Sequence, residues 1–163
     1  MQPEPQAAQD KPAASPGITV VVRPATFDDV PFVMDSWLRS FGKGRTWVFR
    51  GVDGARFYDN HRKIVEELVS RSFVLVACLA EVPDALLGWA CAEKDCLHYM
   101  YVKNKYRRKG VATEMLKSVR HFMNGIDRCS HQTGQWKRFT PGQKLLFSPA
   151  HAFYKPTGEK HGA

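Results

Sequence analysis

The feature that most constrains the fold is a predicted strand that leads into a helix through a short basic turn. Residues 95–103, DCLHYMYVK, have the aromatic and β-branched content of a strand. Five of the nine residues from Lys103 to Val111 are basic. After Gly110, apolar residues recur at helical spacing, and Asn124-Gly125 ends the helix; the apolar positions are Val111, Met115, Val119 and Phe122.

Side-chain alternation in the 95–103 strand predicts two faces. One face would carry Cys96, His98, Met100 and Val102, and the other Leu97, Tyr99 and Tyr101. Further strands are expected over 18–23, 72–80 and 86–93, and helices over about 26–41 and 55–70. The order of elements predicts one α+β domain with a mixed, largely antiparallel sheet flanked by helices.

The two ends of the chain are less regular. Residues 1–17 are rich in Pro, Ala and Gln, which predicts a disordered tail before a single domain at 18–163. Near the C-terminus, we expect a strand over 126–133, a short helix over 134–139 and a last strand over 144–148. The alternative is a helix over 150–158.

Composition narrows the partners and the compartment. The formal net charge of +8 favours anionic partners such as nucleic acid or phosphorylated ligands. The sequence has neither a secretory signal nor a run of 18 apolar residues, so we expect a cytoplasmic protein without a membrane contact. The four cysteines form no CxxC pair, which favours reduced thiols.

The basic turn favours a phosphate-binding role over a nucleic-acid groove. The first turn of a helix has unpaired N–H groups and a positive dipole end, both of which attract anions. Gly110 and Ala112 are small enough to let a phosphate approach the backbone, and the basic residues before them add charge. A solvated charge run or a nucleic-acid patch remains the alternative.

This segment resembles a known family. Arg107-x-x-Gly110-x-Ala112 matches the (Q/R)xxGx(G/A) signature of the GCN5-related N-acetyltransferases (GNAT), and Val102 stands five residues before it, as the family's strand valine commonly does. The segment VVRPATFDD also resembles the family's opening strand and first helix. The resemblance spans roughly residues 19–124.

The resemblance implies acetyl-CoA as the acyl donor and a primary amine as the acceptor. The turn backbone would hold the pyrophosphate, and the strand backbone would pair with the pantetheine arm and polarise the thioester carbonyl. The implied cofactor-binding residues are Met100, Tyr101, Val102, Arg107, Arg108, Lys109, Gly110, Val111, Ala112 and Thr113. Because the family's strand splays from its neighbour, we expect strands 86–94 and 95–103 to part near Met100–Val102.

An alkyl ammonium must lose a proton before it attacks, so a general base is expected. His98 is the first candidate, since some family members carry a catalytic histidine four residues before the valine. Where others carry a glutamate, this chain has Cys96, which leaves Glu93 and Asp95 as nearby substitutes. A structural histidine that bonds a backbone carbonyl is the other interpretation of His98.

The acid that protonates the leaving thiolate is commonly a tyrosine in the family. Tyr154 in Ala150-x-x-Phe153-Tyr154 resembles that pattern, while the alternative C-terminal register offers His131. Cys91, Cys96 and His98 lack zinc-like spacing, so we expect no metal. We expect a monomer or homodimer; the competing hypothesis is a nucleic-acid- or protein-binding module on a degenerate acetyltransferase scaffold.

Overall fold

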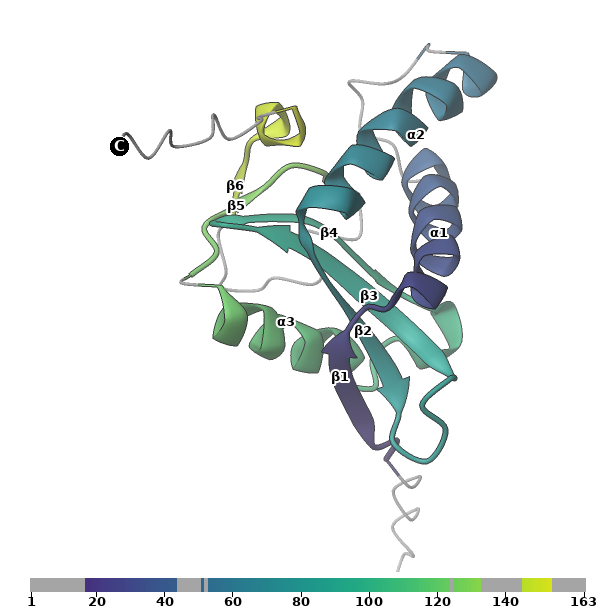
Figure 1. Cartoon of the computed structure of the whole chain (residues 1–163), viewed down its shortest axis with the longest axis vertical. Coiled ribbons are helices and arrows are strands. Elements are labelled where there is room, and N and C mark those ends of the chain that lie inside the picture. The colour runs from purple at the N-terminus through teal and green to yellow at the C-terminus, as the bar shows by residue number, and fades with distance from the viewer. Residues whose placement is uncertain (1–16, 44–50, 52, 124, 133–144, 154–163) are drawn as a thin grey trace, which may run out of the picture.

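The structure is a computed structural model that describes residues 17–43, 51, 53–123, 125–132 and 145–153. A six-stranded sheet forms its centre, with the strands in chain order from β1 to β6 (Figure 1). The strands are β1 (Val20–Pro24), β2 (Phe73–Leu79), β3 (Leu86–Glu93), β4 (Cys96–Val102), β5 (Arg128–Cys129) and β6 (Leu146–Phe147). The first four are antiparallel, whereas β5 runs parallel to β4 and β6 parallel to β5. This mixed sheet confirms the predicted fold class.

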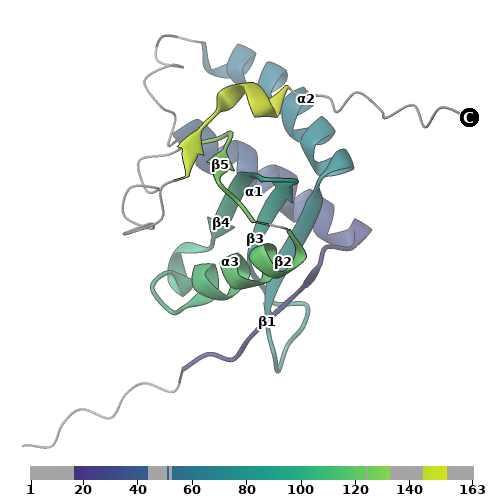
Figure 2. The same cartoon turned by 90° about the vertical axis from the view of Figure 1, so that its left-hand side faces the viewer.

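Three α-helices cover the two faces of the sheet (Figures 1 and 2). α1 (Val30–Lys43) and α2 (Gly54–Arg71) pack together on one face, and α3 (Val111–Phe122) lies on the other. Single turns of 3-10 helix, at Phe27–Asp29, Asn104–Tyr106 and Pro149–Ala152, join these elements. None of the helices in the described ranges has the length and apolar character needed to cross a membrane.

The first helix begins where the sequence predicts, because a capping box precedes it. The Asp29 carboxylate accepts hydrogen bonds from the backbone N–H and hydroxyl of Thr26 at 2.7 and 3.0 Å. Arg23 at the end of β1 also pairs with this buried carboxylate at 2.7 Å. The cap therefore ties the first strand to the first helix.

The sheet separates two apolar clusters. On the α1/α2 face, Trp37 lies between Trp89 and Tyr99, with ring centroids 5.0 and 5.3 Å away. On the α3 face, Leu87, Leu97 and Met115 are fully buried. Burial of both faces explains why β2, β3 and β4 are nearly continuous apolar runs.

A β-bulge at His98 changes the faces predicted for β4. Cys91 of β3 pairs with Tyr99, but the next residue, Ala92, pairs with Leu97, so His98 has no partner position on β3. Leu97 consequently joins the α3-side cluster with Met100 and Val102, and the predicted alternation through Cys96 and His98 is wrong. The extra residue inverts the side-chain parity between the two halves of the strand.

The splay of β4 lies on a different edge from the predicted one. β3 and β4 pair from Glu93 and Cys96 to Gly88 and Val102, so the expected separation of strands 86–94 and 95–103 is wrong. β4 instead pairs with β5 at Cys96 and Leu97 only. Beyond Leu97, the described part of the chain provides no strand beside β4 on that edge.

The C-terminal elements agree in part with the predictions. β5 lies within the strand expected over 126–133, and β6 lies within the strand expected over 144–148. The helix predicted over 134–139 falls outside the described residues, as do residues 1–16 of the expected disordered tail. The start of the alternative helix over 150–158 forms a 3-10 turn, and its remainder from 154 is also outside the described part.

Candidate active site

The turn between β4 and α3 has the backbone geometry of an anion site. Gly110 is the N-cap of α3 and adopts a left-handed conformation with φ +83°. A Cβ built on Gly110 would meet no atom within 4 Å, so the space before the helix is open. Arg108 also has a positive φ of 60°. The left-handed glycine thus leads directly into the first turn of the helix, whose N–H groups follow it.

Hydrogen bonds leave those N–H groups available. The first bond within α3 runs from the Glu114 N–H to the Gly110 carbonyl at 3.0 Å. The N–H groups of Val111, Ala112 and Thr113 precede it and have no carbonyl one turn earlier in the helix. Together with the helix dipole, they form an electropositive site for a phosphate group.

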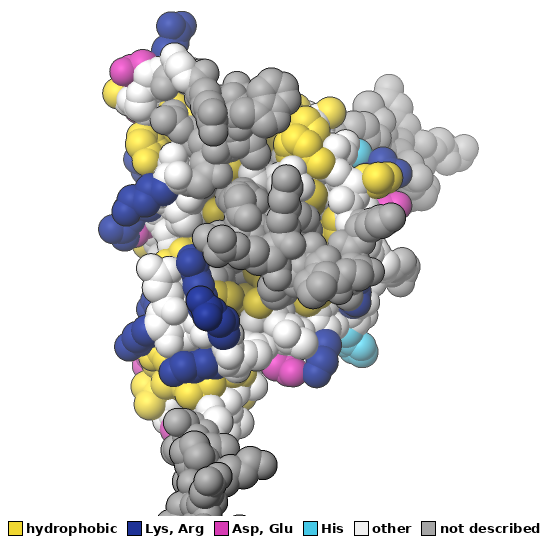
Figure 3. Space-filling view, turned by 180° about the vertical axis from the view of Figure 1, so that it is seen from behind, with side chains coloured by type: hydrophobic (Ala, Val, Ile, Leu, Met, Phe, Trp, Pro, Cys, Tyr) yellow, Lys and Arg dark blue, Asp and Glu magenta, His cyan; other side chains and the backbone are white. Residues whose placement is uncertain are grey.

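Basic side chains surround the turn and hold its shape. Arg107 donates from Nε to the Val102 carbonyl at 3.0 Å, which ties the turn to the end of β4. The Lys105 and Lys109 ammonium groups lie 4.8 and 5.9 Å from the centroid of the Tyr106 ring. Arg107, Arg108 and Lys109 are exposed, and Lys and Arg side chains stand out on the face shown in Figure 3.

The backbone of β4 points toward the open edge at Met100. The Lys103 N–H bonds the Leu87 carbonyl of β3 at 2.8 Å, so Lys103 faces β3. In antiparallel pairing, successive residues alternate in backbone direction, and Met100 and Val102 therefore face away from β3. The Met100 N–H thus lies along the edge that β5 has left, where a ligand could pair with it.

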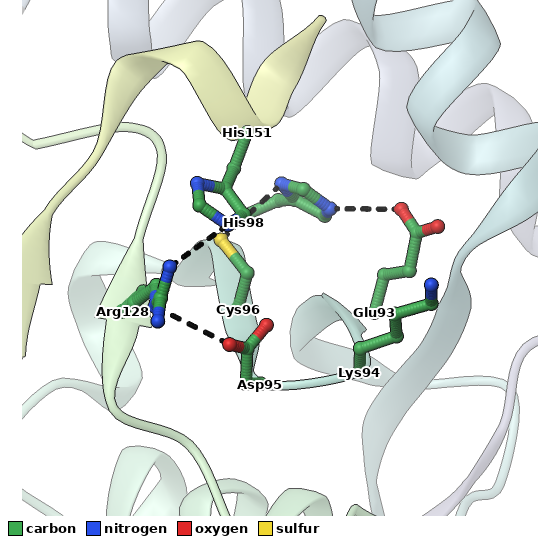
Figure 4. Close-up of a pocket in the computed structure, with 7 residues that line it drawn as sticks. All are labelled: Glu93, Lys94, Asp95, Cys96, His98, Arg128 and His151. Atoms are coloured by element: carbon green, nitrogen blue, oxygen red, sulfur yellow. Dashed lines mark hydrogen bonds and ion pairs between the residues drawn. The ribbon is translucent and has the colours of Figure 1, made fainter. Parts of the chain in front are cut away.

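The bulge residue His98 is buried, with 1% of its surface exposed. Its Nε2 lies 3.4 Å from Glu93 Oε2 (Figure 4). Its Nδ1 lies 2.8 Å from Ser130 Oγ. Burial lowers the pKa of His98 to about 4, although the bond to Glu93 opposes this shift. His98 is therefore neutral at pH 7, and protein groups occupy both of its ring nitrogens.

Glu93 ends β3 at the entrance of a cavity of about 430 Å³ (Figure 4). Its carboxylate forms an ion pair with Arg71 Nε of α2 at 3.1 Å. The cavity is mostly charged; its lining residues are Glu93, Lys94, Asp95, Cys96, His98, Arg128 and His151. Arg128 lies 3.3 Å from Asp95 and 3.5 Å from His151. Glu93 and His98, two of the predicted catalytic residues, therefore meet at one site.

Ser130 and His131 belong to the same site, and the sequence analysis missed the serine. Ser130 Oγ lies 2.8 Å from His131 Nδ1 as well as 2.8 Å from His98 Nδ1. Both residues are buried. Burial, with His61 and His98 as like-charged neighbours, keeps the pKa of His131 well below its usual value. The adjacent Ser-His pair within the strand expected over 126–133 was the available signal.

The predicted acid and the four cysteines remain to be placed. The acid predicted at Tyr154 lies outside the described residues. Cys78, Cys91, Cys96 and Cys129 are buried free thiols, and burial raises the pKa of both Cys91 and Cys96 to about 12. Among the described residues, no group of three or more His, Cys, Asp and Glu side chains is arranged to hold a metal ion.

Comparison with known proteins identifies the family. The family model described as "Acetyltransferase (GNAT) family" matches residues 34–158, which is most of the chain. The chain therefore belongs to the GNAT acetyltransferase family, whose chemistry is acyl transfer. A search of curated proteins finds no significant match to the sequence.

Solved structures agree on the fold. A GCN5-related N-acetyltransferase from Ralstonia eutropha JMP134 is 16% identical with a TM-score of 0.53, covering 89% of this chain and 98% of that one. A Pyrococcus furiosus protein provisionally assigned as an acetyl transferase is 14% identical with a TM-score of 0.55, covering 80% and 98%. Apo YjaB from Escherichia coli is 14% identical with a TM-score of 0.50, covering 67% and 69%.

Proposed function

We propose that this protein is an N-acetyltransferase that uses acetyl-CoA and a primary amine in one ternary complex. The observation that carries the proposal is that, among the described residues, no strand pairs with the outer edge of β4 beyond Leu97, and that β4 leads into the open turn at Gly110. A slender arm can lie along the edge, and a pyrophosphate can bind at the helix N-terminus. Membership of the GNAT family supports this assignment.

The residues predicted to hold acetyl-CoA form two groups along this path. The N–H groups of Val111, Ala112 and Thr113 would bind the pyrophosphate, with charge from Arg107, Arg108 and Lys109. The backbone of Met100 and Val102, which faces the open edge, would pair with the pantetheine arm, whereas the backbone of Tyr101, also predicted to bind the cofactor, faces β3. The Met100 N–H faces the open edge, so it is the candidate donor to the thioester oxygen as negative charge develops there.

The amine must approach from the side where β4 and β5 have parted. Direct attack requires amine, thioester carbon and oxyanion donor to share one cleft. His98 and Glu93 remain the predicted proton-handling residues, and both lie next to the point of divergence. A cytoplasmic location and a monomeric or homodimeric state fit this function and remain predictions.

Calorimetry with acetyl-CoA tests the donor site. We expect the wild type to bind acetyl-CoA and Gly110→Trp to weaken binding at least about 100-fold, because the indole would fill the space before the helix; this ratio corresponds to about 2.7 kcal/mol. Gly125→Trp is the matched control, since Gly125 also has a positive φ, at +105°, and no atom within 4 Å of a built Cβ.

Two outcomes would contradict the proposal. Absence of acetyl-CoA binding by the wild type at millimolar concentration would exclude the donor assignment. Equal loss of binding in both glycine variants would exclude the turn as its site. Nucleic-acid binding that weakens with salt and is unchanged by Gly110→Trp would instead support the binding-module alternative. A screen of amines with acetyl-CoA consumption as readout would identify the acceptor.

A further inference from the structure

A row of four hydrogen-bonded side chains runs from β3 through β4 to the two residues that follow β5, next to the point where β4 and β5 part. From the cavity inward, it comprises Glu93 of β3, His98 of β4, Ser130 and His131. The last three side chains are buried, with 1%, 4% and 6% of their residue surfaces exposed. Buried polar groups in such a row must satisfy one another, so the positions of their protons are constrained.

The ion pair with Arg71 makes Glu93 a carboxylate, which can only accept hydrogen bonds. His98 must therefore donate from Nε2 to Glu93. Because His98 is neutral, its Nδ1 then carries a lone pair and accepts from the Ser130 hydroxyl.

Donors and acceptors can be assigned in the same way for Ser130 and His131. A serine hydroxyl has one proton, which Ser130 has given to His98. The Ser130 oxygen must accept its second bond, so His131 donates from Nδ1. The Nε2 atom of neutral His131 is left with a lone pair. Within the described residues, no hydrogen bond to this atom is found.

His131 lies where β5 leaves β4, and the rings of Phe41 and His61 are its nearest ring neighbours among the described residues, at 4.9 and 5.1 Å. The Ser130 N–H makes the last backbone bond to β4, to the Leu97 carbonyl at 3.4 Å. His131 is the next residue, so it stands where the two strands separate. Its ring lies 5.3 Å from Trp37 and 6.2 Å from Tyr99, on the α1/α2 side of the sheet.

We propose that His131 is the catalytic base for the acetyl transfer, and that Ser130, His98 and Glu93 are positioning residues that hold its tautomer and carry its proton to the cavity. This inference rests on the proposed function. It moves the direct contact with the amine from His98, whose two ring nitrogens are occupied, to His131, whose Nε2 has no hydrogen-bond partner among the described residues. Burial lowers the pKa of His131, so the ring is neutral at pH 7 and can accept a proton, but it is also a weaker base than a free histidine, and the row is needed to carry the proton away.

The step is balanced. Nε2 of His131 takes one proton from the ammonium group; the amine nitrogen then forms a C–N bond with the thioester carbon, and the C–S bond breaks. The bonding pair leaves with sulfur, which takes a second proton from the former amine. One net proton remains, and it passes from His131 through Ser130 and His98 to Glu93 at the solvent-facing cavity.

Nitrogen-15 NMR of the histidine rings tests the proton positions without any substrate. At pH 7, we expect His98 protonated at Nε2 and His131 protonated at Nδ1. Ser130→Ala should release His131 from the Nδ1-protonated form, and Ser130→Thr should retain it. Ser36→Ala is the matched control, because Ser36 is 6% exposed and its hydroxyl bonds the Trp89 ring nitrogen at 2.7 Å.

Kinetics with two amines of similar shape tests the role as a base. 2-Phenylethylamine is a cation at neutral pH and must be deprotonated, whereas phenylhydrazine is already neutral. With saturating acetyl-CoA, we expect His131→Gln to lower kcat for 2-phenylethylamine about 100-fold and Ser130→Ala about 10-fold. Turnover of phenylhydrazine should change less than about 3-fold, acetyl-CoA affinity should be retained, and Ser36→Ala should leave both rates unchanged.

The NMR and kinetic results that would contradict the proposal are the following. An Nε2-protonated His131 in the wild type, or equal rate losses for the two amines, overturns the proposal. If the wild type acetylates neither amine, the NMR result decides, with the predicted tautomers supporting the row and any other pattern overturning it. Failure of the wild type to bind acetyl-CoA would exclude the proposed function without changing the measured tautomers. Failure of the proposed function and failure of the His131 proposal can therefore be distinguished.

Discussion

The two ends of β4 differ in burial and in the groups that they present. Its C-terminal end leads into an exposed turn, where the backbone of Gly110 and the first N–H groups of α3 are offered to solvent. Its N-terminal half contains the bulge at His98, where side chains bond one another in a buried row. One end binds through backbone groups that remain free, and the other holds protons through side chains that are almost all paired.

Substitutions should therefore have different effects on stability at the two ends of β4. At the exposed turn, water can replace a lost contact, so a substitution there should affect a ligand more than the fold. In the buried row, each unpaired group carries a desolvation cost, so a change should affect both stability and chemistry. The predictions below test this contrast, beginning with the largest expected effect.

Acid should destabilise the buried end first. The pKa values of His61 and His98 fall from 6.5 to about 4 on folding, and burial also lowers the pKa of His131 well below 6.5. Their contribution to stability is complete above pH 6.5 and is lost as the pH falls from 6.5 through 4, since the unfolded chain binds the protons more strongly. Protonation of His61 and of His98 should each lower the free energy of unfolding by up to about 3 kcal/mol.

Thermal melts between pH 7.5 and 4.5 would measure this dependence. His61→Phe should flatten it by about a third, because Phe41 and Phe57 already stack on the His61 ring at 4.8 and 5.1 Å and can accept another aromatic ring. His121→Asn on the exposed side of α3 is the control. A melting temperature that does not change across this range would contradict the assignment of neutral buried histidines.

Gly88→Ala tests whether close packing in the buried interior sets the position of the exposed turn. A Cβ at Gly88 would clash with the Tyr101 carbonyl oxygen and lie 3.2 Å from Val102 Cα and 3.3 Å from Met115 Cε. We expect a loss of about 3 kcal/mol, or about 10 °C in melting temperature, with weaker acetyl-CoA binding because the added Cβ displaces β4 and α3 from β3.

Gly54→Ala provides the comparison for that variant. Gly54 begins α2, and a Cβ there would meet no atom within 4 Å. Its melting temperature should stay equal or rise slightly. Equal destabilisation by the two alanines would show that close packing at Gly88 does not position the turn.

Arg107→Ala should affect the ligand more than the fold. The substitution removes the bond from Nε to the Val102 carbonyl together with one positive charge at the turn. We expect acetyl-CoA affinity to fall about 10-fold, which is about 1.4 kcal/mol, while urea denaturation changes little. A large loss of stability with unchanged affinity would reverse the proposed contrast between the two ends of β4.

Lys117→Ala should have the smallest effect. Lys117 pairs with Glu114 at 2.8 Å on the exposed face of α3, with 67% and 46% of the two side chains exposed. Such pairs contribute about 0.5 kcal/mol or less. Affinity for acetyl-CoA and the midpoint of urea denaturation should both stay close to wild type, and a marked loss of affinity would show that the basic site extends along α3.

Much of the fold was predictable from local patterns. The strands of the β1–β4 sheet and the three helices appear where hydrophobic spacing and caps indicate, within a few residues. The turn at Gly110 was also predictable, because the left-handed conformation of its glycine and the exposure of its N–H groups depend on near neighbours.

The side-chain part of the candidate site, to which we assign the proton transfer, was harder to predict from the sequence. His98 and Glu93 were identified by position, but the alternation assigned to β4 failed because a bulge cannot be read from residues that are all strand formers. Ser130 was missed because its bond to His98 spans 32 residues of sequence. Contacts at such separation leave no periodic signal.

By itself, the sequence determined the secondary elements, the basic turn and the family signature, since each depends on residues within a few turns of one another. Only the tertiary structure decided which edge of β4 opens and which side chains meet beside it. The physical reason is that the bulge at His98 and the parting from β5 arise where strands from distant parts of the chain pack together. Those same contacts leave one ring nitrogen of His131 without a partner among the described residues.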